Sequence, residues 1–149
     1  MELQKRFRGF VELHLSGKVE FLLVGGYALA VHGAPRFTED IDFLIHLSAK
    51  NADRLIQVIE KFGFGDLEIE RDDFLKPEFV IQLGVAPNRI DILTGIDGLN
   101  WEETWDSKID YELDGLPIHV IGKEQLIKNK LASGRTKDLA DAERLLQGG

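Results

Sequence analysis

The sequence contains no cysteine, which removes several structural and chemical possibilities. Disulfide bonds are excluded, and so are zinc or iron–sulfur sites with cysteine ligands. The four histidines are scattered along the chain and form no zinc-binding or Ser/His/Asp spacing; they are His14, His32, His46 and His119. Because a chain without disulfides fits a reducing compartment, we expect a cytoplasmic protein.

Long apolar runs and basic residues are also scarce. No apolar stretch approaches the roughly 20 residues of a membrane-spanning helix, and residues 1–20 are charged and amphipathic rather than a signal peptide. Lysine and arginine number 18 against 26 aspartates and glutamates, which gives a net charge of -8. This charge argues against a broad basic surface that wraps nucleic acid and leaves room for a local basic groove.

The chain length of 149 residues suits a single domain over residues 1–149, with an α/β core over 1–121 and a helical hairpin over 122–149. Apolar periodicity predicts helices over residues 2–15, 26–33, 48–62, 99–108, 123–133 and 136–147. It predicts strands over residues 20–25, 40–46, 66–71, 79–85, 89–93, 110–113 and 117–121. Hairpins dominate the middle of the chain, so we expect an α+β fold with a mixed β-sheet flanked by helices.

The most informative pattern joins a glycine turn to a pair of carboxylates. Residues 21–24 are apolar and run into Gly25-Gly26, and a second apolar run carries Asp40 and Asp42. Alternate residues of a strand share a face, so the two aspartates should lie side by side in an otherwise buried segment. Two adjacent carboxylates repel, and a divalent cation between them removes that cost. Because glycines leave backbone N–H groups open to phosphate, the pattern predicts a metal site beside a phosphate-binding turn.

A third carboxylate, Asp91, stands in the middle of the apolar strand expected over residues 89–93. If this strand lies beside residues 40–46, three carboxylates converge on one face. Such a set can hold two Mg²⁺ (or Mn²⁺) ions about 3.5–4 Å apart, the arrangement used for in-line phosphoryl or nucleotidyl transfer. Asp40, Asp42 and Asp91 would then be both metal ligands and catalytic residues, with Asp91 helping to deprotonate an acceptor hydroxyl.

The two C-terminal helices bring further charges toward the interior. Lys130 falls on the apolar face of the first helix, and Asp138 lies at the edge of the apolar stripe of the second. The two residues form either a structural salt bridge or a lysine aimed at a bound triphosphate and oriented by the aspartate. The expected stripe of the last helix consists of Leu139, Ala142 and Leu146. Other basic residues that could cover phosphates are Arg36, Arg135 and Lys137.

These patterns together resemble the DNA polymerase β nucleotidyltransferase superfamily. The fuller strings resemble the small bacterial branch that includes the AbiEii-type toxin nucleotidyltransferases, and the resemblance runs from about residue 20 to residue 146. The strings are Val24-Gly25-Gly26-Tyr27-Ala28, His32-Gly33, Arg36-Phe37-Thr38-Glu39-Asp40-Ile41-Asp42, and Lys130 followed by Gly134-Arg135-Thr136-Lys137-Asp138-Leu139-Ala140-Asp141.

The resemblance implies a nucleotidyltransferase-like fold with two C-terminal helices. It implies that Asp40, Asp42 and Asp91 bind the metals and that Gly25 and Gly26 contact the triphosphate. Many relatives carry serine at the second glycine, so here only backbone would meet the phosphate at that position. The remaining residues implied in nucleotide binding are Arg36, Thr38, Lys130, Arg135, Lys137 and Asp138.

The predicted activity is Mg²⁺-dependent transfer of an NMP from an NTP, such as ATP, to an acceptor hydroxyl. The acceptor could be an RNA end such as that of a tRNA, a protein or a small molecule, and the protein could pair with an antitoxin or with a second copy of itself. A non-catalytic, antitoxin-like nucleotide-binding module is the alternative from another class. A metal-dependent phosphohydrolase with the same carboxylates is a third reading.

The acidic residues also have a purely structural reading. Asp40 and Asp42 could bond to Arg36 or cap loops, although two acids in a buried strand need a compensating charge. Asp91 could be the ion-pair partner of Arg89 or of a lysine.

Overall fold

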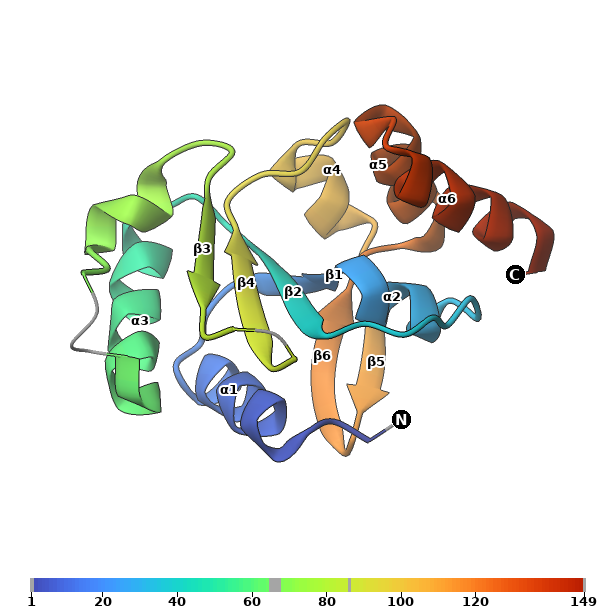
Figure 1. Cartoon of the computed structure of the whole chain (residues 1–149). Helices are drawn as coiled ribbons and strands as arrows, with labels where there is room; N and C mark the ends of the chain where they lie inside the picture. The colour runs from blue at the N-terminus through green and yellow to red at the C-terminus, as the bar shows by residue number, and fades with distance from the viewer. Residues whose placement is uncertain (1, 65–67, 86, 149) are drawn as a thin grey trace.

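The computed structural model describes residues 2–64, 68–85 and 87–148, which form an α+β fold (Figure 1). Within these residues a six-stranded mixed sheet has the strand order β3-β4-β2-β1-β6-β5. The strands are β1 (Phe21–Val24), β2 (Asp40–Ile45), β3 (Val80–Leu83), β4 (Arg89–Leu93), β5 (Ile109–Leu113) and β6 (Leu116–Val120). The helices are α1 (Lys5–Ser16), α2 (Gly25–Val31), α3 (Ala49–Ile59), α4 (Trp101–Asp106), α5 (Lys123–Ser133) and α6 (Thr136–Gly148), with short helical turns η1 (Glu60–Phe64) and η2 (Arg71–Leu75). The expected mixed sheet flanked by helices is confirmed.

Strand β2 holds a central place in the sheet and differs between its two faces. It pairs antiparallel with β1 and parallel with β4. Ile41, Phe43 and Ile45 point to one face and are buried, and the ring of Phe43 lies 5.9 Å from that of Phe10 on α1. The opposite face carries Asp40 and Asp42. The apolar face of β2 therefore packs against α1, and its acidic face points to the other side of the sheet.

Local capping fixes where several helices begin and end. The hydroxyl oxygen of Ser48 accepts a hydrogen bond of 3.1 Å from the backbone N–H of Asn51, so α3 begins directly after the serine. Asn100 and Glu103 form a reciprocal capping box at the start of α4. Gly134 adopts the left-handed conformation, with φ of 69°, and separates α5 from α6. Figure 1 shows these two C-terminal helices, coloured orange to red, packed together beyond one side of the sheet.

The strand expected over residues 66–71 is not formed in the part that the structure describes. Residues 66 and 67 lie outside the described residues, residues 68–70 are irregular, and Arg71 begins the turn η2. Glu70 and Asp73 cap this turn reciprocally, and the backbone N–H of Glu70 donates a 2.9 Å hydrogen bond to Asp73. Phe74 is buried by the same turn. The reciprocal caps and the burial of the Phe74 ring thus favour a helical turn over the strand that the weak apolar alternation predicted.

The last helix is rotated relative to the expected apolar stripe. Leu139 and Leu146, two of its three members, are 43% and 66% exposed. The buried residues of α6 are Asp138, Asp141, Ala142 and Leu145. Both of these carboxylates bind the buried Lys130, and turning the leucines inward would carry them away from it. The ion pairs therefore set the rotation of the helix. No helix among residues 2–64, 68–85 and 87–148 is long and apolar enough to cross a membrane.

Candidate active site

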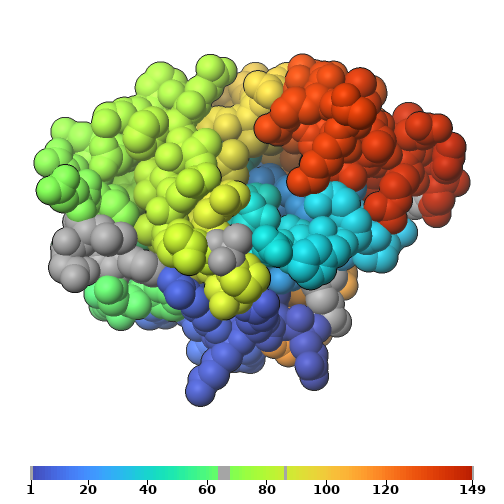
Figure 2. Space-filling view, in the orientation of Figure 1, coloured from blue at the N-terminus to red at the C-terminus, as the bar shows by residue number. Residues whose placement is uncertain are grey.

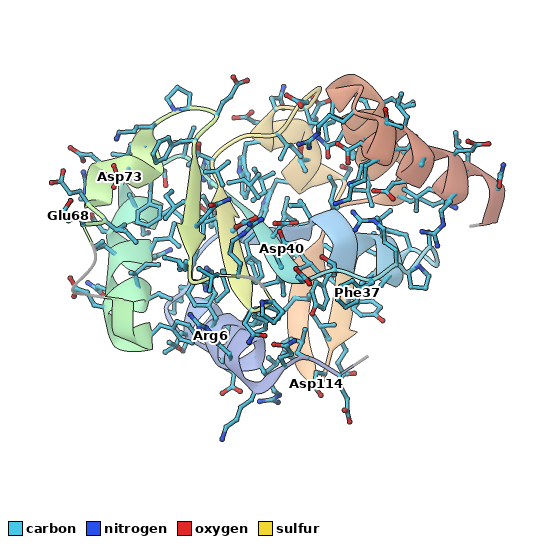
Figure 3. All side chains as sticks on the ribbon, in the orientation of Figure 1. Arg6, Phe37, Asp40, Glu68, Asp73 and Asp114 are labelled. Atoms are coloured by element: carbon cyan, nitrogen blue, oxygen red, sulfur yellow. The ribbon has the colours of Figure 1, made fainter. Side chains whose placement is uncertain are left out.

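The three predicted carboxylates meet on one face of the sheet. Parallel pairing of β2 and β4 sets Asp42 opposite Asp91 and Asp40 opposite Arg89. Each of the three aspartates offers a carboxylate oxygen, and these oxygens lie within 4.8 Å of one another. Figure 3 shows Asp40 near the centre of the molecule, between the β3–β4 side and the C-terminal helices. The condition set by the sequence, that residues 89–93 lie beside residues 40–46, is met.

The carboxylate of Asp42 lies in an environment that disfavours its charged form. Burial, and then the charges of Asp40 and Asp91, raise the pKa of Asp42 to about 8. A hydrogen bond with Asp91 also raises this pKa, and the charge of Lys130 lowers it. Asp42 therefore holds a proton in the metal-free protein, and a bound cation would replace that proton by removing the repulsion among the three carboxylates. All donor atoms are carboxylate oxygens, so the set fits a hard divalent ion such as Mg²⁺ or Mn²⁺.

The guanidinium of Arg89 provides the positive charge closest to this set. Its Nη2 atom donates to Asp40 Oδ2 at 2.6 Å and to Asp91 Oδ2 at 3.1 Å, and its Nε atom donates to Asp91 Oδ1 at 2.8 Å. The ion pair of Asp91 with Arg89, which the sequence offered as an alternative, is therefore present. Arg36 does not contact Asp40 or Asp42 and instead pairs with Asp141.

The glycine turn and the acidic strand are fitted to each other. Gly25 has a φ of +70°, and a Cβ built on it would lie 2.0 Å from Asp42 Oδ2. Gly26 is buried, and a Cβ there would lie 3.0 Å from Thr38 Cβ and 3.1 Å from Thr38 Oγ1. The Thr38 hydroxyl also donates to Asp40 Oδ1 at 3.1 Å. Thr38 thus takes up the space into which a serine side chain at position 26 would extend.

A second charged network joins the C-terminal helices to the loop before β2. The buried Lys130 lies 3.0 Å from Asp138 Oδ1 and 3.2 Å from Asp141 Oδ2. Arg36 makes a two-pronged contact with Asp141, at 3.0 and 3.2 Å. Arg135 binds Asp138 at 2.9 Å. The network holds α5, α6 and the loop in one arrangement, with its three cationic side chains paired to Asp138 and Asp141.

Asp138 is held strongly in its charged form. Burial raises its pKa, but hydrogen bonds from Ser133, Lys130 and Arg135 outweigh burial and lower the pKa of Asp138 to about 2. The expected pairing of Lys130 with Asp138 is confirmed, and the pair is structural at least in part. Asp141 was not among the predicted site residues. Its spacing of three from Asp138 is the signal that could have found it, because both fall on one helix face.

A cleft of about 590 Å³ is lined by these groups apart from Asp141. Figure 2 shows the hollow between the yellow-green surface of β3 and β4 and the orange-red C-terminal helices. Every residue predicted for the site lines it: Gly25, Gly26, Arg36, Thr38, Asp40, Asp42, Asp91, Lys130, Arg135, Lys137 and Asp138. The wall opposite the C-terminal helices was not predicted and includes Glu78, Val80 and Gln82. Asp97, which also lines the cleft, lies beside α5, where its backbone oxygen accepts a 3.0 Å hydrogen bond from Asn129. Val80 and Gln82 lie two apart on β3, and this alternation is the signal for the strand part of that wall. Glu78 belongs to the turn before β3 and carries no such signal.

Comparison with protein-family models matches residues 13–113 to the family described as the nucleotidyl transferase AbiEii toxin of type IV toxin–antitoxin systems. The matched segment is more than half of the 149 residues. No curated protein gives a significant sequence match.

Three solved structures share the fold. A candidate nucleotidyltransferase from Thermotoga maritima has a TM-score of 0.65 at 18% identity, and the match covers 94% of this chain and 89% of that one. The lincosamide antibiotic adenylyltransferase LnuA, solved with lincomycin, has a TM-score of 0.56 at 17% identity, with 98% of both chains covered. The antibiotic-resistance factor ANT(2'')-Ia has a TM-score of 0.58 at 12% identity, with 94% of this chain and 80% of that one covered. At these identities the likeness shows the nucleotidyltransferase-like fold.

Proposed function

This chain belongs to the AbiEii family of nucleotidyltransferases, and from that membership we propose that it transfers an NMP from an NTP to an acceptor hydroxyl with the help of Mg²⁺. The observation that carries the proposal is the convergence of Asp40, Asp42 and Asp91 beside the Gly25 turn. Three carboxylates at this distance repel one another, Arg89 pairs with only two of them, and the donor set suits Mg²⁺ or Mn²⁺.

In this proposal Asp40 and Asp42 hold two divalent ions and Asp91 completes the set on the acceptor side. When bound, the ions supply charge neutralisation at the reacting phosphate and the leaving pyrophosphate. The acceptor oxygen forms a bond to the α-phosphorus, the bond from that phosphorus to the β-phosphate oxygen breaks, and pyrophosphate leaves. Asp91 accepts the proton of the acceptor hydroxyl.

The remaining cleft residues position the nucleotide. Gly25 and Gly26 offer backbone N–H groups without a side chain in the way, and Thr38 adds a hydroxyl beside them. Basic side chains on the opposite side pair with the phosphates; they are Arg36, Lys130, Arg135 and Lys137. Asp138 orients Lys130 and Arg135 from behind.

The acceptor and the biological role are tested together. The matched family is described as a toxin family, and LnuA is a lincosamide antibiotic adenylyltransferase, so RNA and small-molecule acceptors both belong in the assay. An antitoxin that binds this chain directly is checked by identifying the proteins that copurify with it. A second copy of the chain as partner is checked by light scattering.

The decisive assay incubates the protein with each α-labelled NTP, Mg²⁺, and total RNA, total protein or a panel of hydroxyl-bearing small molecules. We expect label on one acceptor class, loss of transfer in Asp42→Asn, and normal transfer in the control Asp110→Asn, whose carboxylate is 88% exposed and pairs with His119. Tight NTP binding without transfer in every arm would favour the non-catalytic module. Phosphate release without any acceptor would favour a phosphohydrolase.

A further inference from the structure

Arg89 occupies an unusual place among the site residues, because it sits where a cation is needed. It opens β4 in register with Asp40, and its side chain is 32% exposed. Its single Nη2 atom lies between one oxygen of Asp40, at 2.6 Å, and one oxygen of Asp91, at 3.1 Å. Among the residues that the structure describes, it is the basic side chain in direct contact with two of the three carboxylates, those of Asp40 and Asp91.

The second nearby cation cannot replace it. The Lys130 ammonium lies 3.0 Å from Asp138 and 3.2 Å from Asp141. It is therefore already paired with two carboxylates outside the set formed by Asp40, Asp42 and Asp91. Arg89 has no comparable anchor, since all of its ion pairs go to Asp40 and Asp91. In the free protein Arg89 therefore supplies the positive charge that is in direct contact with Asp40 and Asp91.

A divalent ion and the observed position of Arg89 exclude each other. Mg²⁺ binds carboxylate oxygens at about 2.0–2.1 Å, which would place it within a few ångströms of a guanidinium that holds the same oxygens. Like charges so close in a half-buried cleft repel strongly. When the ion binds, the guanidinium must release Asp40 and Asp91 and turn into the cleft that it lines.

We propose that Arg89 is a displaceable internal counter-ion that weakens metal binding in the free protein and couples metal loading to nucleotide binding. The inference rests on the proposed function, because the nucleotide's phosphates give the displaced guanidinium a new anion to pair with. Metal alone has to displace Arg89 without this compensation. Metal that arrives with a nucleotide leaves the guanidinium paired, so the two ligands bind cooperatively.

The alternative is that Arg89 merely orders the carboxylates. In that case its removal would let the acids move apart and would weaken metal binding. The two roles predict opposite signs for the same variant, and the sign can be measured without any turnover.

The experiment measures Mn²⁺ binding by calorimetry and by electron paramagnetic resonance, with and without a non-hydrolysable NTP analogue. Arg89→Met keeps the length of the side chain and removes its charge, and we expect it to bind Mn²⁺ alone about tenfold more tightly than the wild type. In Arg89→Met, the factor by which the NTP analogue tightens Mn²⁺ binding should be smaller than in the wild type by a similar amount. Arg89→Lys should stay close to the wild type. Arg71→Met is the matched control, because Arg71 pairs with Asp53 and Asp72 outside the cleft, and it should change neither value.

If Arg89→Met binds Mn²⁺ no more tightly than the wild type does, the proposed counter-ion role of Arg89 is wrong. Circular dichroism and a melting curve with Mn²⁺ show whether the variant is folded, and a fold lost without Mn²⁺ but restored by it supports the displacement. If the wild type binds Mn²⁺ and Arg89→Met gains nothing, only this inference fails. If neither protein binds Mn²⁺ with or without the analogue, the proposed function itself fails.

Discussion

The carboxylate of Asp42 occupies the space that a side chain at position 25 would need, since a Cβ on Gly25 would lie 2.0 Å from Asp42 Oδ2. The same glycine has a left-handed backbone, with φ of +70°. The turn that opens α2 and the carboxylate at the middle of the acidic set are therefore one unit. A substitution at Gly25 therefore displaces the Asp42 carboxylate, and a substitution at Asp42 alters the packing of the Gly25 turn.

Gly25→Ala tests this relationship. The left-handed backbone costs an alanine about 1–2 kcal/mol, and the overlap with Asp42 adds a cost of similar size. We expect the free energy of unfolding in urea to fall by about 2 kcal/mol or more, and Mn²⁺ binding to be lost. Gly33→Ala is the control, because its φ is +88° and a Cβ there meets nothing within 4 Å. Equal losses in the two variants would show that the contact with Asp42 contributes nothing.

Asp42 predicts an inverted pH dependence for the metal-free protein. Its folded pKa of about 8 lies above its ordinary value of 3.8, so its stabilising effect is complete below pH 3.8 and is lost as the pH rises through 8. The free energy of unfolding of the wild type should fall relative to Asp42→Asn by up to about 1.4 kcal/mol per pH unit between pH 5 and 7. Millimolar Mg²⁺ should remove this fall, because the ion replaces the proton. Parallel curves for the two proteins without Mg²⁺ would contradict the assignment.

His14 predicts a second effect, on the acidic side. Its ring is fully buried against Phe10, Phe21 and Phe43, and burial lowers the pKa of His14 from 6.5 to about 4. Because the folded pKa is depressed, the stabilising effect is present above pH 6.5 and is lost as the pH falls through 4. The loss should reach about 3 kcal/mol over that range. Denaturation of wild type and His14→Phe at several pH values measures it, and a ring resonance that titrates near pH 6.5 would contradict it.

Lys130 should matter more for stability than an exposed lysine in a comparable pair. Lys130→Met leaves two buried carboxylates, Asp138 and Asp141, without their shared cation, and we expect a loss of about 3 kcal/mol in the free energy of unfolding. Lys128→Met is the control, because that lysine is 58% exposed and pairs with Glu103 at 3.4 Å, and it should cost less than about 1 kcal/mol. Losses of the same size in both variants would mean that the buried network adds nothing.

The placement of the three aspartates on two apolar strands could be predicted from the sequence because it rests on short-range rules. Their convergence also needs β2 to pair with β4, which the sequence offered only as a condition. Alternation along a strand places Asp40 beside Asp42, and an acid inside an apolar run, as at Asp91, requires a polar partner. The capping residues of α3 and the glycine between α5 and α6 are equally local signals.

The remaining features depend on how elements meet in space. Arg89 at the start of a strand has the same pattern whether it points to solvent or bridges two carboxylates, and only the register of β2 and β4 decides. The rotation of α6 follows from the burial of Lys130, which the apolar stripe of that helix does not encode. The β3 wall of the cleft likewise depends on which face of the strand is turned toward the cleft.

The most direct test of the central claim is a crystal structure of the protein grown with millimolar Mn²⁺ and a non-hydrolysable NTP analogue, with data collected at the manganese absorption edge. We expect anomalous density between Asp40 and Asp42, with Asp91 in contact with the ion on the acceptor side and the triphosphate over the Gly25 turn. An ordered cleft with no anomalous density between Asp40 and Asp42 would contradict it.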